Sequence, residues 1–345
     1  MSPYILFVML SSLGLGTTLT FTSSHWLLAW MGLEINTLAI IPLMTNKHHP
    51  RAVEAATKYF LTQAAAAAIL LFASIYNAWY SGQWFIQDMS SPVSTLMTLA
   101  IAIKLGIAPM HFWLPEVMQG ISISTGLILV TWQKLAPLAL LMQISHNIKP
   151  ELLIILGLMS TIIGGWGGLN QTQIRKIMAY SSIAHLGWII SILHFMPALA
   201  MFNLFIYLIM TITMFMTFNL LNSPTINTLA MNWSKSPILA ATSALALLSL
   251  GGLPPLSGFM PKWLIIQELT NQELAPTATL LALSALLSLF FYLRLSYSLS
   301  LTIMPNTHPQ TLNWNMKTTT PLPLSLMMMM TLTMLPITPT IISLF

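Results

Sequence analysis

Apolar runs of about 20 residues recur along the whole chain, separated by short polar or Gly/Pro-rich gaps. At a rise of 1.5 Å per residue, a helix of about 20 residues crosses a hydrocarbon layer roughly 30 Å thick. Only 6% of the 345 residues are charged, whereas soluble domains average about a quarter. The sequence therefore predicts an all-α polytopic membrane protein, with one transmembrane domain over residues 1–345.

Eleven apolar runs are candidate membrane spans. They cover about residues 4–21, 26–44, 55–79, 93–117, 121–144, 152–169, 174–193, 199–221, 238–269, 277–301 and 322–344. The fourth is interrupted at Pro109 and the ninth at residues 251–255, five spans later. Because an odd offset reverses orientation, we expect an inverted repeat of two five-helix units, 4–144 and 152–301, with an extra helix at 322–344.

The loops after spans two, six, eight and ten hold most of the basic residues. These are Lys47, Arg51, Arg175, Lys176, Lys235 and Lys317. The positive-inside rule places these loops, and the N-terminus, in the compartment of synthesis, and the C-terminus across the membrane. The first basic residue is Lys47, so we expect no cleaved secretory or transit segment before it.

Four charged residues lie inside or beside predicted spans. Glu34 is ~12 Å into the second span, and Lys134 is about 20 Å from the start of the fifth and about 15 Å from its end. Lys104 precedes the first break and Lys262 follows the second, at comparable places in the two units. Burying an ionised group costs several kcal/mol, so such groups are rarely retained without a use. Neighbouring helices pack closely enough for water to link such groups, so these four residues predict a lateral proton wire.

A structural interpretation of these charges stays open: Glu34 would pair with one lysine, and the others would bind the carbonyls freed at the breaks. His111, after the first break, and His185, in the seventh span, are weaker relay candidates that packing explains equally well. We also expect an i,i+4 pair between Glu54 and Lys58, and an Arg294 side chain that reaches towards water.

Several classes of site are not expected in this chain. It has no cysteine, which removes thiolate metal sites and iron–sulfur ligation. Its histidines form no i,i+4 pair and no cluster with carboxylates, so no metal is predicted. A scattered formal charge of +5 does not suit nucleic acid.

Five stretches of sequence resemble a known family. They are LEINTLAIIP (33–42), EAATKYF (54–60), HFWLPEV (111–117), GLNQTQ (168–173) and GGLPPLSGF (251–259). The chain resembles, over essentially its whole length, the subunit 2 family of mitochondrial NADH:ubiquinone oxidoreductase, respiratory complex I, in its vertebrate form. That family is similar to subunits of cation/proton antiporters. Its bacterial members begin with extra helices, and the chain resembles them from their fourth helix onward.

The resemblance implies a proton-translocating subunit of the respiratory chain in the mitochondrial inner membrane, with the N-terminus on the matrix side and the C-terminus on the intermembrane side. Glu34, Lys104, Lys134 and Lys262 match the glutamate and lysines of the family. NADH, FMN, iron–sulfur clusters and ubiquinone would act in electron transport within partner subunits, with no cofactor or redox centre in this chain.

The resemblance also implies partners, namely other membrane-arm subunits, including antiporter-like ones, and lipids such as cardiolipin. A freestanding cation/proton antiporter is the alternative function, and a passive scaffold is the third.

Overall fold

The structure is a computed structural model that describes residues 3–46, 49–87, 89–234, 236–300 and 322–343. Within these ranges the chain consists of helices joined by short turns, and strand pairing is limited to two isolated bridges. The predicted spans therefore form as helices wherever they can be followed. Lys47, Lys235 and Lys317, used above to orient the chain, lie outside the described residues.

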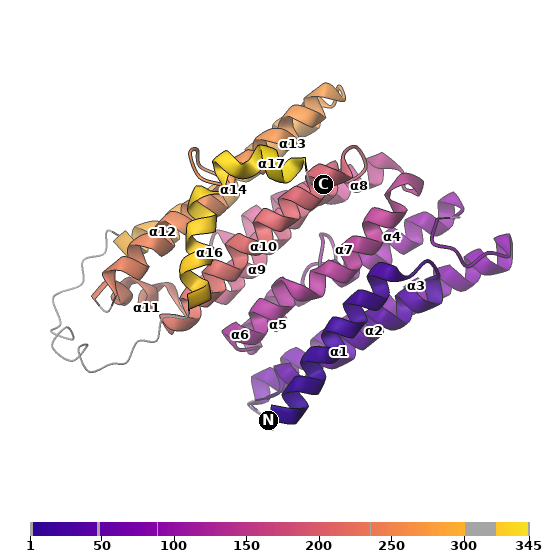
Figure 1. The fold of residues 1–345 in the computed structure, drawn as a ribbon, viewed down its shortest axis with the longest axis horizontal. Helices are drawn as coiled ribbons and strands as arrows, with labels where there is room; N and C mark the ends of the chain where they lie inside the picture. The colour runs from indigo at the N-terminus through magenta and orange to yellow at the C-terminus, as the bar shows by residue number, and fades with distance from the viewer. Residues whose placement is uncertain (1–2, 47–48, 88, 235, 301–321, 344–345) are drawn as a thin grey trace. The chain divides into compact units, whose positions relative to one another are not determined.

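The chain divides into two compact units, Met1–Ser160 with Leu193–Phe195, and Thr161–Ile192 with Met196–Phe345. In the first unit α2 packs against α1 and α3, and α3 also packs against α4 and α5 (Figure 1). Its helices are α1 (Pro3–Thr22), α2 (Trp26–Met44), α3 (Pro50–Ser81), α4 (Ser91–Leu105), α5 (Trp113–Gly120), α6 (Ile123–Val130), α7 (Trp132–Ile144) and the 3₁₀ turn η1 (Ser145–Asn147). The next helix, α8 (Pro150–Gly168), is shared between the units.

The second unit is built around α10, which packs against α9, α12 and α16, while α12 also packs against α14. Its elements are α9 (Ile174–Ile192), α10 (Pro197–Leu220), α11 (Ile226–Ala230), η2 (Met231–Ser234), α12 (Pro237–Gly251), α13 (Phe259–Asn271), α14 (Ala275–Ser300), α16 (Leu322–Thr333), η3 (Leu335–Ile337) and α17 (Thr338–Ile342). The predicted unit boundaries at 144 and 152 are not tested by this division and stay a prediction.

Among the described residues, seven helical segments are long and apolar enough to cross a membrane. They are α1, α2, α3, α6 to η1 taken together, α8, α10 and α14. The other predicted spans are the two broken ones, whose halves are short, the more polar α9, and the C-terminal one. That last span was predicted as one helix but bends by 70° between Thr333 and Leu335, since Pro336 and Pro339 lack the N–H that would continue the helix.

Both predicted breaks are present, and they are built alike. α4 ends before Gly106 (φ 73°) and α12 ends before Gly252 (φ 80°), a left-handed conformation that glycine adopts without strain. The next residue then donates back into the helix, Ile107 N to Ala102 O at 3.0 Å and Leu253 N to Leu248 O at 3.3 Å. Each half-helix is thus closed by the same glycine-ended turn.

The two breaks also align residue by residue. The same spacing of 146 residues separates Gly106 from Gly252, the start of α4 from that of α12, and the start of α5 from that of α13. In this register Lys104 matches Leu250, and Lys262 matches Glu116. The expectation that the two lysines occupy comparable places is therefore wrong: they lie on opposite sides of their breaks.

Candidate functional site

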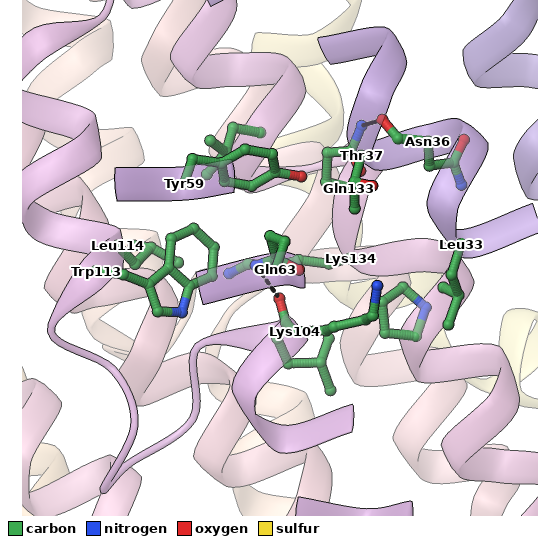
Figure 2. Close-up of a pocket in the computed structure, with 13 residues that line it drawn as sticks. Leu33, Asn36, Thr37, Tyr59, Gln63, Lys104, Trp113, Leu114, Gln133 and Lys134 are labelled. Atoms are coloured by element: carbon green, nitrogen blue, oxygen red, sulfur yellow. Dashed lines mark hydrogen bonds between the residues drawn. The ribbon is translucent and has the colours of Figure 1, made fainter. Parts of the chain in front are cut away.

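A small cavity within the first unit is lined by two of the predicted residues. The cavity measures about 20 Å³, which is room for about one water molecule. Figure 2 shows Lys104 of α4 and Lys134 of α7 among the side chains around it. The full lining is Leu33, Asn36, Thr37, Tyr59, Gln63, Lys104, Leu105, Trp113, Leu114, Leu129, Gln133, Lys134 and Pro137. Two buried amines therefore face one water-sized space.

Lys104 lies in the last turn of α4 and is 6% exposed. Its Nζ has no hydrogen-bond partner among the described residues, and the Oε2 atom of Glu34 is likewise buried and without one. No ion pair joins Glu34 to a lysine within the described part of the chain. The pairing of Glu34 with one lysine therefore stays a prediction.

Lys134 lies near the start of α7 and is 4% exposed. The residue before it, Gln133, donates its amide to the carbonyl of Asn36 at 3.2 Å and so ties α7 to α2. This contact fixes the first turn of α7 beside the cavity. Lys134 is therefore held at the same space as Lys104, as a wire through adjacent helices requires.

Neutral polar side chains complete the lining, and the sequence analysis missed them. Asn36, Gln63 and Tyr59 are each at most 3% exposed, and Gln63 donates to the backbone carbonyl of Lys104 at 3.4 Å. Amides and hydroxyls both donate and accept, so they can hold a water between the amines. The sequence feature that could have revealed these three residues is a polar side chain within an otherwise apolar run.

Lys262 has a different environment, in the second unit. It is 9% exposed, and its Nζ donates to the carbonyl of Gly251 at 2.8 Å and to that of Leu250 at 3.4 Å. A Cβ on Gly252 would come within 2.9 Å of this amine. Lys262 thus caps the C-terminus of α12, where carbonyls lack helical partners and a cation is favourable. This is the contact that the structural interpretation expects.

The two candidate histidines are buried but lie apart from that cavity. His111 sits between α4 and α5, with its Nδ1 3.2 Å from the carbonyl of Pro109. The Nε2 of His185, in α9, lies 3.4 Å from the hydroxyl of Tyr292 of α14, and its ring lies 5.4 Å from that of Tyr207 of α10. These tyrosines come from distant parts of the sequence, so spacing could not reveal them.

Two other charge predictions can be compared with the structure. The Glu54–Lys58 pair is confirmed at 2.8 Å, and Lys58 also binds Glu116 of α5 at 2.8 Å, a partner that was not foreseen. The Nη1 of Arg294 donates to the carbonyl of Leu169 at 2.8 Å, just past the end of α8. Whether this side chain also reaches water stays a prediction.

No metal centre can be assembled from the part of the chain that the structure describes. No group of three or more His, Cys, Asp or Glu side chains there could hold an ion. The buried polar groups of this site are amines, amides, imidazoles and hydroxyls, which exchange protons and bind water. The chemistry that this arrangement supports is proton transfer.

Comparison with known proteins identifies the family. Residues 23–290 match the family described as NADH:quinone oxidoreductase/Mrp antiporter, and residues 289–342 match the NADH dehydrogenase subunit 2 C-terminus. A relative from Polypterus ornatipinnis, NADH-ubiquinone oxidoreductase chain 2, is 77% identical over 345 residues and covers 100% of both chains. The chain belongs to the NADH-ubiquinone oxidoreductase chain 2 family.

Solved structures agree with this membership in the chain 2 family. A chain of respiratory complex I from Thermus thermophilus with bound aureothin has a TM-score of 0.82 and 28% identity, covering 89% of this chain and 73% of that one. A chain of the Mrp complex from Dietzia sp. has a TM-score of 0.76 at 18% identity, covering 84% and 59%. The second likeness shows the shared antiporter-like membrane fold alone.

Proposed function

We propose that this chain carries protons through its own buried charges as a membrane-arm subunit of proton-translocating NADH:ubiquinone oxidoreductase. Its place in the chain 2 family makes it a subunit of that enzyme complex in the respiratory chain. Redox chemistry in partner subunits, which hold the NADH, flavin, iron–sulfur and ubiquinone sites, drives the transfer. The chain itself contributes no redox centre, in line with its lack of cysteine.

The observation that carries the proposal is the water-sized cavity lined by Lys104 and Lys134. The Glu34 carboxylate favours the protonated form of Lys104, because an opposite charge nearby stabilises a buried cation. When that carboxylate is neutralised or moves away, Lys104 can pass its proton through the water to Lys134. Lys262 is the terminal group that exchanges protons with one aqueous face, and His111 and His185 are secondary relays.

The proposal includes the finer architecture and setting. Ten of the eleven spans form the inverted repeat of 4–144 and 152–301, and the eleventh, 322–344, lies outside it. The matched breaks, each beginning with a 15-residue half-helix, support this. The inner mitochondrial membrane holds the chain, with the N-terminus on the matrix side. Other membrane-arm subunits, antiporter-like ones among them, and lipids such as cardiolipin cover its lipid-facing surface.

Lys134→Met in the assembled complex tests the proposal. Methionine keeps the length and the apolar stem but removes the titratable amine. We expect NADH-driven proton translocation to fall at least about tenfold, the lower range for losing a proton-transfer group, and electron flow to fall with it because the two are coupled. Proton uptake and NADH oxidation would be measured in reconstituted vesicles.

Lys149→Met is the matched control, since Lys149 is exposed before α8 and should leave both rates unchanged. Amounts of assembled complex are compared first, because losing one member of a buried charged set can cost about 3–5 kcal/mol. Normal proton translocation by assembled Lys134→Met complex would return this lysine to a structural role.

A further inference from the structure

The two helix breaks are closed by different chemistry. In the second, the Lys262 amine binds carbonyls at the end of α12. The matching position in the first is Glu116, whose carboxylate binds Lys58 at 2.8 Å and is 53% exposed. A carboxylate cannot donate to carbonyls. In the first break Gln63 donates to the carbonyl of Lys104, the match of Leu250, and a further side-chain donor reaches the same turn from α5.

Trp113 supplies that donor. It is the first residue of α5, is 8% exposed, and its Nε1 donates to the carbonyl of Ile103 in the last turn of α4 at 3.0 Å. The matching residue in the second break is Phe259, the first residue of α13, which has no ring N–H. The carbonyl of Ile103 also accepts the N–H of Gly106 at 3.1 Å, so the indole adds a second donor there and ties the first turn of α5 to the last turn of α4.

The indole of Trp113 also touches the surroundings of Lys104. A Cβ on Gly106 would lie 3.2 Å from its Cζ2, and its ring meets that of Tyr59 edge-on at 5.7 Å and 60°. Trp113 lines the cavity with Lys104, as Figure 2 shows. Trp113 thus fixes the last turn of α4 at the point from which Lys104 projects.

We propose that Trp113 is a positioning residue of the proton path, whose indole N–H ties α5 to the last turn of α4. The Lys104 amine has no hydrogen-bond partner among the described residues, and this tie keeps the turn that carries it beside the cavity. This inference rests on the function proposed above and adds a residue to it.

Two substitutions separate the N–H of Trp113 from its bulk. Trp113→His keeps a five-membered ring whose Nε2 can stand where the indole Nε1 stands, but loses the fused ring. Trp113→Phe keeps an aromatic six-membered ring and loses the donor, which reproduces the residue found at Phe259. Each variant is made in the whole chain and assayed in the assembled, reconstituted complex for proton translocation and NADH oxidation per complex.

We expect Trp113→Phe to lower proton translocation about fivefold, the factor that matches one net hydrogen bond, and Trp113→His to retain at least twice the Trp113→Phe rate. Trp30→Phe is the matched control, because Trp30 donates to the carbonyl of Ala67 at 3.1 Å between α2 and α3, away from the break; its rate should stay near that of the wild type.

A Trp113→Phe rate equal to or above that of Trp113→His overturns the proposal, because bulk and not the N–H would then matter. If either variant prevents assembly, the yields of assembled complex are compared instead of the rates. A yield for Trp113→Phe at or above that for Trp113→His also overturns the proposal. Lys134→Met is assayed in the same experiment to separate the proposed proton path from the role of Trp113. Normal proton translocation by the Lys134→Met complex refutes the proton path, whereas the Trp113 variants test only the contact at the first break.

Discussion

At the scale of single residues, three lysines of the same chemistry have three different surroundings. Lys104 has an amine without a hydrogen bond among the described residues, Lys134 lies across a water-sized cavity from it, and Lys262 binds two carbonyls. All three are buried, so the same side chain occupies three different settings within predicted spans.

Glu34→Gln tests the carboxylate that acts on Lys104. The amide keeps the shape and removes the charge, so the protonated form of Lys104 loses its nearby anion. We expect proton translocation by the assembled complex to fall several-fold, with NADH oxidation by the separated hydrophilic partner subunits intact. Glu151→Gln is the control, since Glu151 is exposed at the start of α8. Full pumping by assembled Glu34→Gln complex would show that no carboxylate is required there.

The sequence predicted residues whose chemistry is conspicuous in an apolar run, and missed those whose role depends on a distant partner. Lys104 and Lys134 stand out because charge is rare inside a span. Gln63 and Trp113 become informative only when α3 and α5 pack onto the end of α4. Their acceptors are backbone carbonyls in the last turn of α4, which no side-chain pattern displays.

At the scale of elements, ends were predicted well where strong signals coincide. The second span has the predicted bounds, Trp26–Met44. The third was placed too late: α3 begins at Pro50, a favoured first residue, and His49 accepts the N–H of Arg51 at 3.2 Å. Both helix breaks were predicted correctly from their Gly and Pro residues. Apolarity alone finds spans, whereas capping groups set their ends.

Lys262 can be tested as a cap and as an exchanging group separately. Arginine keeps donors and charge but does not deprotonate, whereas methionine removes both. We expect Lys262→Met to leave a buried carbonyl unpaired, costing about 1–3 kcal/mol and lowering the melting temperature of the complex. Lys262→Arg should assemble normally yet translocate protons at least about tenfold more slowly. Normal translocation by Lys262→Arg complex would make the residue a cap alone.

At the scale of the whole molecule, two compact units each contain one broken helix closed by a glycine-ended turn. The side chains around the two breaks have diverged: the first holds a cavity with an unbonded amine, and the second holds a capped helix end. Two breaks with matching backbones therefore carry different side-chain chemistry, and the proton path proposed above assigns them different roles.

The orientation of the chain in the membrane yields the last prediction, because the basic loop before α9 should face the matrix. The chain contains no cysteine, so a single introduced thiol reports on one loop of this subunit. Thr172 is exposed between α8 and α9, and His146 is exposed before α8, at the opposite end of that 19-residue span. Since one span separates the two positions, they must lie on opposite faces.

Thr172→Cys should therefore react with a membrane-impermeant maleimide only in inverted vesicles, whose matrix face points outward, and His146→Cys only in mitoplasts. Arg175 and Lys176 follow Thr172 directly, so its accessibility reports on the basic loop from which the orientation was derived. Labelling of this subunit is compared with that of the unmodified chain, which has no thiol of its own. Reaction of Thr172→Cys from the intermembrane side would invert the topology, and with it the face at which Lys262 exchanges its proton.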